Sequence, residues 1–107
     1  MNRFSATLRH KVWLEEAVRE ADGAGGSTLA WEEIMALWAE ITPANAVETL
    51  FAGQLVPNAT HRFRVRYSSR IALGMRLRHN DRIFSIRGLK NVGEEGKVLD
   101  ILAVEEV

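Results

Sequence analysis

The segment His61-Arg62-Phe63-Arg64-Val65-Arg66-Tyr67 alternates strictly between arginines and large ring or aliphatic side chains. Successive residues of a β-strand point to opposite faces of a sheet. The alternation therefore predicts a strand with Phe63, Val65 and Tyr67 on one face and three arginines on the other. Such a strand supplies one wall of a core and one cationic surface.

The arginines belong to a wider separation of charge along the chain. Between Thr60 and Lys90 there are nine basic residues and one acid, Asp81, whereas the rest of the chain has five basic residues and thirteen acids. The net charge of zero hides this asymmetry. Charge gathered on one part of a small neutral protein predicts either a polyanionic partner or the complementary acidic face of another subunit.

A length of 107 residues predicts a single domain, residues 1–107. The chain has no cysteine, which excludes disulfides and thiolate metal sites and fits a reducing compartment. The first residues lack the apolar run of a signal peptide, and no stretch approaches the roughly 20 apolar residues of a membrane span. We expect a soluble protein made in the cytoplasm, with no membrane partner.

The N-terminal half gives mixed signals. Period-two alternation predicts a first strand from about Leu8 to Val18, and the small and glycine-rich residues at about 19–28 predict a long, mobile loop. Over residues 29–41, Ile34, Leu37, Trp38 and Ile41 have the spacing of a helical stripe, and Met35, Leu37, Ala39 and Ile41 also alternate as in a strand. Taken alone, the local pattern favours a helix.

The second half reads as a series of turns and strands. After Thr42-Pro43, an N-cap at Asn45 followed by Glu48 predicts a short helix at about 45–54. Asn80-Asp81 predicts the turn of a hairpin between strands at 75–79 and 82–86, and residues 97–104 predict a final strand. This order indicates a mainly β protein: a small antiparallel β-barrel or sandwich with one short α-helix and a long loop.

An ordered series of motifs resembles the phage head-tail joining family, whose members are also called head-closure or stopper proteins. The series comprises Leu8 to Val12, Trp31, Leu37 to Pro43, Phe51 to Gln54, and Thr60 to Tyr67. The resemblance extends from Leu8 to Glu106, and the family occurs in long-tailed phages and phage-derived gene transfer agents. The stretch Glu15 to Val18 departs from it, because members tend to carry more basic and polar residues there.

The resemblance implies a small β-barrel in which residues 29–41 are largely a strand. It also implies a homo-oligomeric ring, a hexamer or a dodecamer, at the neck of a virion or gene-transfer-agent particle. The implied partners are a portal-side adaptor ring and the tail-side terminator or tail tube proteins. Double-stranded DNA would pass through the channel of the ring with transient, non-specific contact.

Nothing in the sequence predicts catalysis. His10, His61 and His79 lie on separate predicted elements without metal-ligand spacing, and Ser68, Ser69 and Ser85 lack a nucleophile motif. The glycines at 23–26 lack the strand, helix and lysine of a phosphate-binding loop. We therefore expect no enzymatic activity, no metal and no cofactor.

The candidate site residues are those that would face another subunit or the DNA channel. They are basic (Arg62, Arg64, Arg66, Arg76, Arg78 and Arg82), acidic (Glu15, Glu16, Glu94 and Glu95) or aromatic (Trp13). For the basic face, pairing with acids of a neighbouring subunit, contact with DNA and simple solvation all remain open. Trp38 is assigned to the core, and Trp13, out of phase with its apolar neighbours, to a subunit contact.

The alternative function is that of a small β-barrel that binds nucleic acid through the basic surface from Arg62 to Arg82. Such barrels stack bases on exposed aromatic rings. Here Phe63 and Tyr67 are expected on the face opposite the arginines, so the cationic face has charge but no stacking groups. The pattern therefore favours the structural role.

Overall fold

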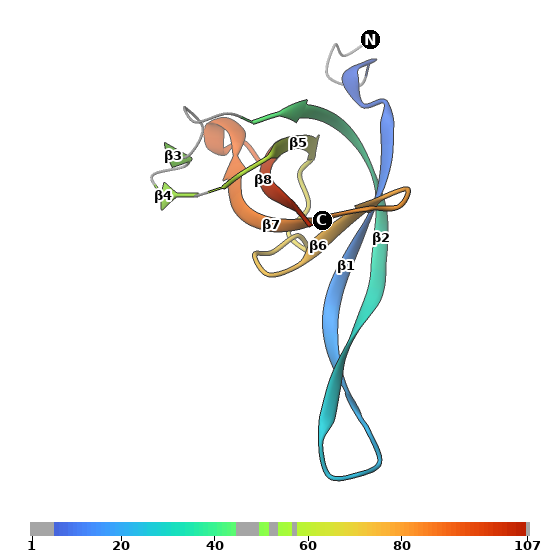
Figure 1. Ribbon diagram of the computed structural model, residues 1–107. Helices are drawn as coiled ribbons and strands as arrows, with labels where there is room; N and C mark the ends of the chain where they lie inside the picture. The colour runs from blue at the N-terminus through green and yellow to red at the C-terminus, as the bar shows by residue number, and fades with distance from the viewer. Residues whose placement is uncertain (1–5, 45–49, 52–53, 57, 107) are drawn as a thin grey trace.

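Strands make up most of the computed structural model, which describes residues 6–44, 50–51, 54–56 and 58–106 (Figure 1). Within those residues the strands are β1 (His10–Ala21), β2 (Ser27–Pro43), β3 (Leu50–Phe51), β4 (Gln54–Leu55), β5 (His61–Arg66), β6 (Arg76–His79), β7 (Arg82–Asn91) and β8 (Val98–Glu106). The 3-10 turn η2 (Val92–Glu94) connects β7 to β8.

Six of these strands close into a barrel in the order β1-β2-β5-β8-β7-β6. All neighbouring strands are antiparallel, and β6 pairs back onto β1 from Trp13↔Arg78 to Glu15↔Arg76. The predicted small antiparallel barrel is thereby confirmed. The predicted hairpin is also present, with Asn80 in the left-handed backbone region (φ 58°) at its turn.

The barrel interior is filled by the alternating apolar residues. Phe63 and Val65 of β5 are fully buried, as predicted, and the ring of Phe63 packs edge-on against Phe84 of β7 at 4.8 Å between centroids. Tyr67, the third residue of the predicted apolar face, lies beyond the end of β5 and is 41% exposed. The core alternation therefore ends where the strand ends.

The strands β1 and β2 run out of the barrel as a long hairpin (Figure 1). They pair with each other as far as Ala21↔Ser27, but β6 pairs with β1 only up to Glu15, and β5 pairs with β2 only from Ala39 onward. Residues 16–32, called the arm below, form a two-stranded ribbon with no third strand among the described residues. The molecule is consequently elongated, with extents of 53 × 31 × 26 Å.

The arm replaces the long loop predicted at 19–28. Strand pairing continues through that segment, and only residues 22–26 form the turn. There the Asp22 carboxylate accepts hydrogen bonds from the backbone N–H groups of Ala24 and Gly26, and Gly23 and Gly25 supply the positive φ values that the turn requires. The glycines and small polar residues at 22–26 therefore form the turn of a hairpin rather than part of a long loop.

The local preference of residues 29–41 for helix is wrong, and the strand implied by the family resemblance is correct. Residues 27–33 and 35–39 pair with β1, and 39–43 pair with β5. This ladder overrides the helical preference of the alanines, glutamates and leucine. A register shift between Leu14 and Glu15 places Ile34 as an extra residue in β2, which interrupted the alternation and made the segment look helical.

The helix predicted at about 45–54 is not supported by its described residues. Leu50–Phe51 and Gln54–Leu55 pair antiparallel as β3 and β4; residues 45–49 and 52–53 lie outside the described residues. A helix of two turns has little intrinsic stability, so a short strand pair can replace it.

Candidate interaction surface

The arginines of β5 lie on the outside of the barrel, and Arg64 is held there by an acid of the same chain. Its Nε and Nη2 atoms donate hydrogen bonds to the two carboxylate oxygens of Asp100, at 2.6 and 2.8 Å. Asp100 is directly opposite on β8 and is buried. These hydrogen bonds raise the pKa of Arg64, against the opposing effect of partial burial. Arg62 and Arg66 also have interactions in the structure.

A second ion-pair cluster fixes the root of the arm. Glu15 is buried and accepts hydrogen bonds from Arg76 (2.7 Å) and Arg78 (3.2 Å), and Arg78 also reaches Glu33 at 3.3 Å. The two arginines are outward-facing neighbours on β6, so their charges would repel without the carboxylates. Glu15 therefore compensates charge within its own chain, which is the role that the sequence suggested for a neighbouring subunit's acid.

Aromatic rings cover the same arginines. The guanidinium carbon of Arg76 lies 4.2 Å from the ring centroid of Trp31, and that of Arg78 lies 5.8 Å from the ring centroid of Trp13. The Lys11 amine lies 4.8 Å from the same Trp13 centroid. Trp13 thus packs among cations of its own chain, and its predicted subunit contact remains a prediction.

A third charged group surrounds Arg82 on β7. Arg82 donates to both oxygens of Glu105, at 2.8 and 2.9 Å, and its Nη2 atom lies 3.3 Å from Nε2 of His61. The hydrogen bonds from Arg82 lower the pKa of Glu105 and raise that of Arg82. Burial, followed by the positive charge of Arg82, lowers the pKa of His61.

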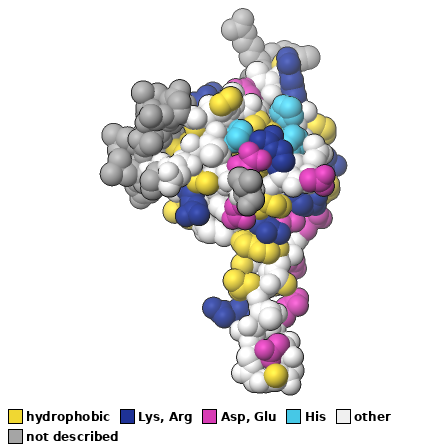
Figure 2. Space-filling view, viewed as in Figure 1, with side chains coloured by type: hydrophobic (Ala, Val, Ile, Leu, Met, Phe, Trp, Pro, Cys, Tyr) yellow, Lys and Arg dark blue, Asp and Glu magenta, His cyan; other side chains and the backbone are white. Residues whose placement is uncertain are grey.

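The fold brings together histidines that the sequence leaves far apart. The rings of His10 and His79 meet edge to face with centroids 5.3 Å apart. Burial, and then the charges of His10 and Arg82, lower the pKa of His79. Figure 2 shows imidazoles on both sides of a basic and acidic pair on one face of the body. Among the described residues, no three histidines or acids gather as a metal site.

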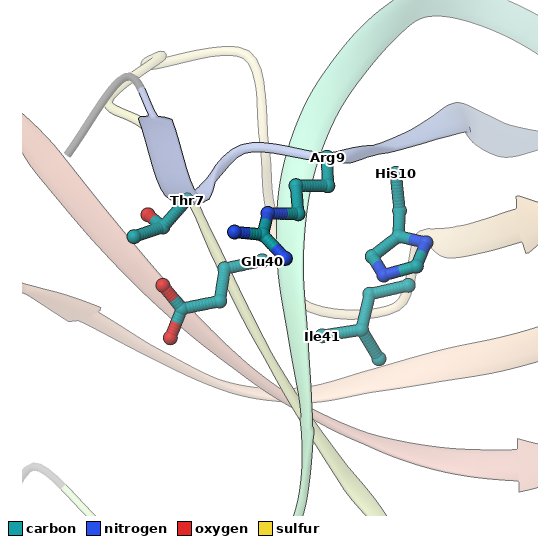
Figure 3. A pocket seen from close by; sticks show the side chains of 5 residues that line it. All are labelled: Thr7, Arg9, His10, Glu40 and Ile41. Carbon is teal, nitrogen blue, oxygen red and sulfur yellow. The ribbon is translucent and has the colours of Figure 1, made fainter. Parts of the chain in front are cut away.

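A surface hollow of about 360 Å³ lies where the chain enters β1 (Figure 3). Its walls are Thr7, Arg9, His10, Glu40 and Ile41. In Figure 3 the carboxylate of Glu40 and the imidazole of His10 point away from each other, so they form no acid–base pair. The hollow offers polar contacts rather than a catalytic arrangement.

A second hollow, of about 260 Å³, is more apolar and lies where β2 continues past its last partner on β5. We call it the aromatic hollow; its lining is Leu8, Met35, Ala36, Leu37, Trp38, Arg66, Tyr67 and Ser68. Trp38, which the sequence assigned to the core, is 55% exposed. The assignment is wrong because Leu37 and Ala39 point into the barrel, and Trp38 between them must point outward.

The remaining acidic candidates take no part in these clusters. Glu16 is in the arm, directly opposite Glu32. Glu94 and Glu95 are exposed in and after η2, where Glu95 approaches Lys97 at 4.0 Å. The structure therefore gathers the predicted residues into several small clusters rather than one surface. Sequence reasoning missed Asp100 and Glu105, whose partners are set by strand register.

No helix among the described residues is long and apolar enough to cross a membrane.

Comparisons with known proteins agree with this fold. The chain is similar to one in the solved virion of a native gene transfer agent particle, with 33% identity and a TM-score of 0.66, over 94% of this chain and 96% of that one. The solution structure of protein SF1141 from Shigella flexneri 2a shares the fold, with 23% identity and a TM-score of 0.74, over 100% of this chain and 98% of that one. No curated protein matches the chain.

Residues 5–106 match the family model described as phage head completion protein. Together with the gene-transfer-agent chain, this match confirms the resemblance to head-closure proteins that the sequence motifs suggested. A structural component of a phage or gene-transfer-agent head accounts for these similarities. The chain belongs to the phage head completion protein family.

Proposed function

We propose that this protein closes the DNA-filled head and joins it to the tail. It would form a homo-oligomeric ring on the portal-side adaptor, offer its other side to the tail proteins, and pass DNA through its channel. The observation that carries the proposal is the similarity, over nearly the full length of both chains, to a chain of a gene-transfer-agent virion. The role requires assembly, with neither catalysis nor a cofactor.

The charge distribution supports passage of DNA without tight binding. Each phosphate neutralised by a lysine or arginine adds about 0.9 to the salt dependence of binding, so a strongly basic channel would hold DNA back. Here Arg64, Arg76, Arg78 and Arg82 are each engaged by a carboxylate of the same chain. Their charges are offset before DNA is present.

The same ion pairs disfavour the alternative, a nucleic-acid-binding module. Such a module needs arginines free to meet phosphates and aromatic rings on which bases stack. The arginine strand instead places Phe63 in the core, and Arg64 is committed to Asp100. The geometry therefore supports the structural role better.

The test is electron microscopy of particles from a producer strain that lacks this gene. Heads that are filled or leaking, beside free and complete tails, would establish a role in closure or joining. Restoration of tailed particles by the gene supplied separately is the control. Normal tailed particles in the deletion strain would overturn the proposal.

A further inference from the structure

The arm has no third strand beside it among the described residues. An isolated two-stranded ribbon is at best marginally stable in water, and both of its edges offer unpaired backbone groups. Trp31, near the root, is covered on one face by Arg76 yet remains 38% exposed, and Leu29, further out, is 61% exposed. The arm thus carries apolar surface that the described part of its own chain leaves open.

The arm has an excess of acidic residues, whereas the rest of the molecule has an excess of basic residues. The arm contains four acids and one basic residue, Arg19, whereas the rest of the chain contains ten acids and thirteen basic residues. Figure 2 shows acidic side chains along the arm, while most of the Lys and Arg side chains in view lie on the body. A second copy of this protein therefore offers a body whose excess charge is opposite to that of the arm.

One pair in the arm lacks the compensation found at its root. Glu15 and Glu33 face each other across the two strands, and Arg76 and Arg78 neutralise them. Glu16 and Glu32 also face each other, but no ion pair links either of them to another residue that the structure describes. Like charges directly opposite in a ribbon are destabilising. A cationic surface from outside would remove that repulsion.

The aromatic hollow has the properties that a receiving surface needs. Two of the large hydrophobic side chains exposed on the described part of the body, Trp38 and Tyr67, line it, whereas Leu73 does not; Arg66 is also part of the lining. Arg70, exposed, follows shortly after Ser68 and donates its backbone N–H to the Ser68 hydroxyl. An apolar floor with basic residues beside it complements an acidic ribbon that carries Leu29 on one face and Glu16 and Glu32 on the other.

The outer part of the arm cannot reach the position of Ala36 in its own molecule. Leu29 and Ala36 lie seven positions apart on one extended strand, which separates their Cα atoms by about 23 Å. Any contact between Leu29 and Ala36 must therefore join two molecules.

We propose that the arm of each copy docks in the aromatic hollow of the next copy. The contact is head-to-tail, because two different surfaces meet, and repetition of such a contact closes a ring when the rotation between copies divides a full turn. The inference rests on the proposed function, in which the protein forms a ring, and it names the contact that links the subunits.

The absence of cysteine allows a direct test. The variant with both Leu29→Cys and Ala36→Cys is produced in the deletion strain, and purified particles are oxidised and examined on a non-reducing gel. A disulfide requires Cα atoms within about 7 Å, so these two positions cannot be bridged within one chain. The expected result is a ladder of covalent multimers that collapses to the monomer on reduction.

Three control variants show whether the disulfide-linked multimers come from the proposed contact. Leu29→Cys alone and Ala36→Cys alone should give monomers, and Leu29→Cys combined with Asp81→Cys, an exposed hairpin position, should give no ladder. Dimers from Leu29→Cys alone would show that arms meet each other and would overturn the inference. In the double variant, cross-linking of the cysteine introduced at position 29 only to a different virion protein would overturn it as well.

The amount of protein in the particles separates the two proposals. If the chain is present in particles and no ladder forms, the arm contact is wrong while the connector function stands. If the chain is absent from wild-type particles, the connector function itself fails.

Charge reversal is a second test, which needs no cysteines. The variant with both Glu16→Lys and Glu32→Lys should reduce the incorporation of the protein into particles about tenfold, the effect of losing roughly one good contact. Asp81→Lys, a charge reversal at an exposed hairpin position outside the candidate set, should leave incorporation unchanged.

Discussion

Glu15 links β1 to β6 at the joint between barrel and arm. It is a buried carboxylate whose two oxygens meet two guanidinium groups, 61 and 63 positions further along the chain. A buried ion pair contributes little compared with an apolar pair, but removing one partner leaves the other charges uncompensated. The cluster therefore makes the protein sensitive to changes at this position.

Replacing Glu15 with Gln keeps the volume of the side chain and removes its charge. We expect the free energy of unfolding to fall by about 1–3 kcal/mol, because Arg76 then loses its carboxylate partner and Arg78 retains only Glu33. Urea denaturation measures the change. Glu94→Gln, at an exposed position, is the control and should change it by less than about 0.5 kcal/mol. Equal effects of the two variants would contradict the structural role of Glu15.

Histidine protonation should destabilise the fold in mildly acidic solution. Burial lowers the pKa of His61 and His79 below the ordinary value of 6.5, so the folded state binds these protons less readily than the unfolded chain. Their contribution to stability is complete above 6.5 and is lost as the pH falls through the folded pKa values. The pKa of Glu105 is also lowered, and its contribution disappears only as the pH falls below 4.5.

The measurement is thermal unfolding between about pH 7.5 and pH 5.5, the range in which histidine titrates. The wild-type protein should lose stability across this range, and His79→Gln should lose less. A wild-type melting temperature that stays constant or rises on acidification would contradict the burial of these two imidazoles.

At the scale of residues, the sequence predicted which side chains of a strand are buried better than it predicted which charged residues pair with each other. The alternation around Phe63 and Val65 correctly assigned which side chains are buried, because a strand has only two faces. It did not predict Arg64–Asp100 or Arg76–Glu15, because these pairs depend on the register between strands that are distant in sequence. Trp38 was misplaced for a related reason: helical and strand spacing assign it to opposite faces, and only the pairing of β2 decides between them.

At the scale of elements, the arm shows where composition misleads. Glycines and small polar residues predicted a long mobile loop, yet the pairing from Glu16↔Glu32 to Ala21↔Ser27 is continuous. The family resemblance correctly implied a strand for residues 29–41, although it did not specify how far the hairpin extends. The extent of a ribbon follows from the match between two strands, which neither strand reveals alone.

The arm should be removable without unfolding the barrel. Ala17 and Trp31 are directly opposite each other, so replacing residues 18–30 with Asn-Gly would close the hairpin by a two-residue turn. We expect the free energy of unfolding to change by less than about 1 kcal/mol, because every residue removed lies outside the core. Circular dichroism during urea denaturation measures this stability.

The same variant should be lost from particles. Immunoblots of purified particles from the complemented deletion strain measure its incorporation. A shortened protein that folds and is incorporated at the wild-type level would show that the arm has no part in assembly. A shortened protein that fails to fold would show that the barrel depends on the arm.

At the scale of the whole molecule, the zero net charge has a structural meaning. The arginine-rich half and the acidic half are interleaved in space, since β5, β6 and β7 supply the arginines while β1, β2 and β8 supply their partners. The charge separation seen in the sequence is thus largely cancelled on the barrel. What remains is an excess of acid on the arm and an equal excess of basic residues on the rest of the chain.

This cancellation predicts weak binding of the isolated protein to duplex DNA. At physiological salt, we expect a dissociation constant above about 100 μM, the weak end of non-specific DNA binding. Fluorescence anisotropy with a labelled duplex, repeated at low salt, measures it. Micromolar binding with a steep salt dependence would instead favour the nucleic-acid-binding alternative.

The strands β1 and β2 pass from barrel to arm without a break, and this continuity restricts how the protein can change in length. Adding two residues to each strand would extend the ribbon by about 7 Å and leave every side chain on its original face. Adding one residue to each strand between the Glu16–Glu32 pair and the Arg19–Leu29 pair would exchange the two faces beyond the insertion and turn Leu29 to the side of Glu16 and Glu32. In functional relatives, each strand of this hairpin should therefore be longer or shorter by an even number of residues.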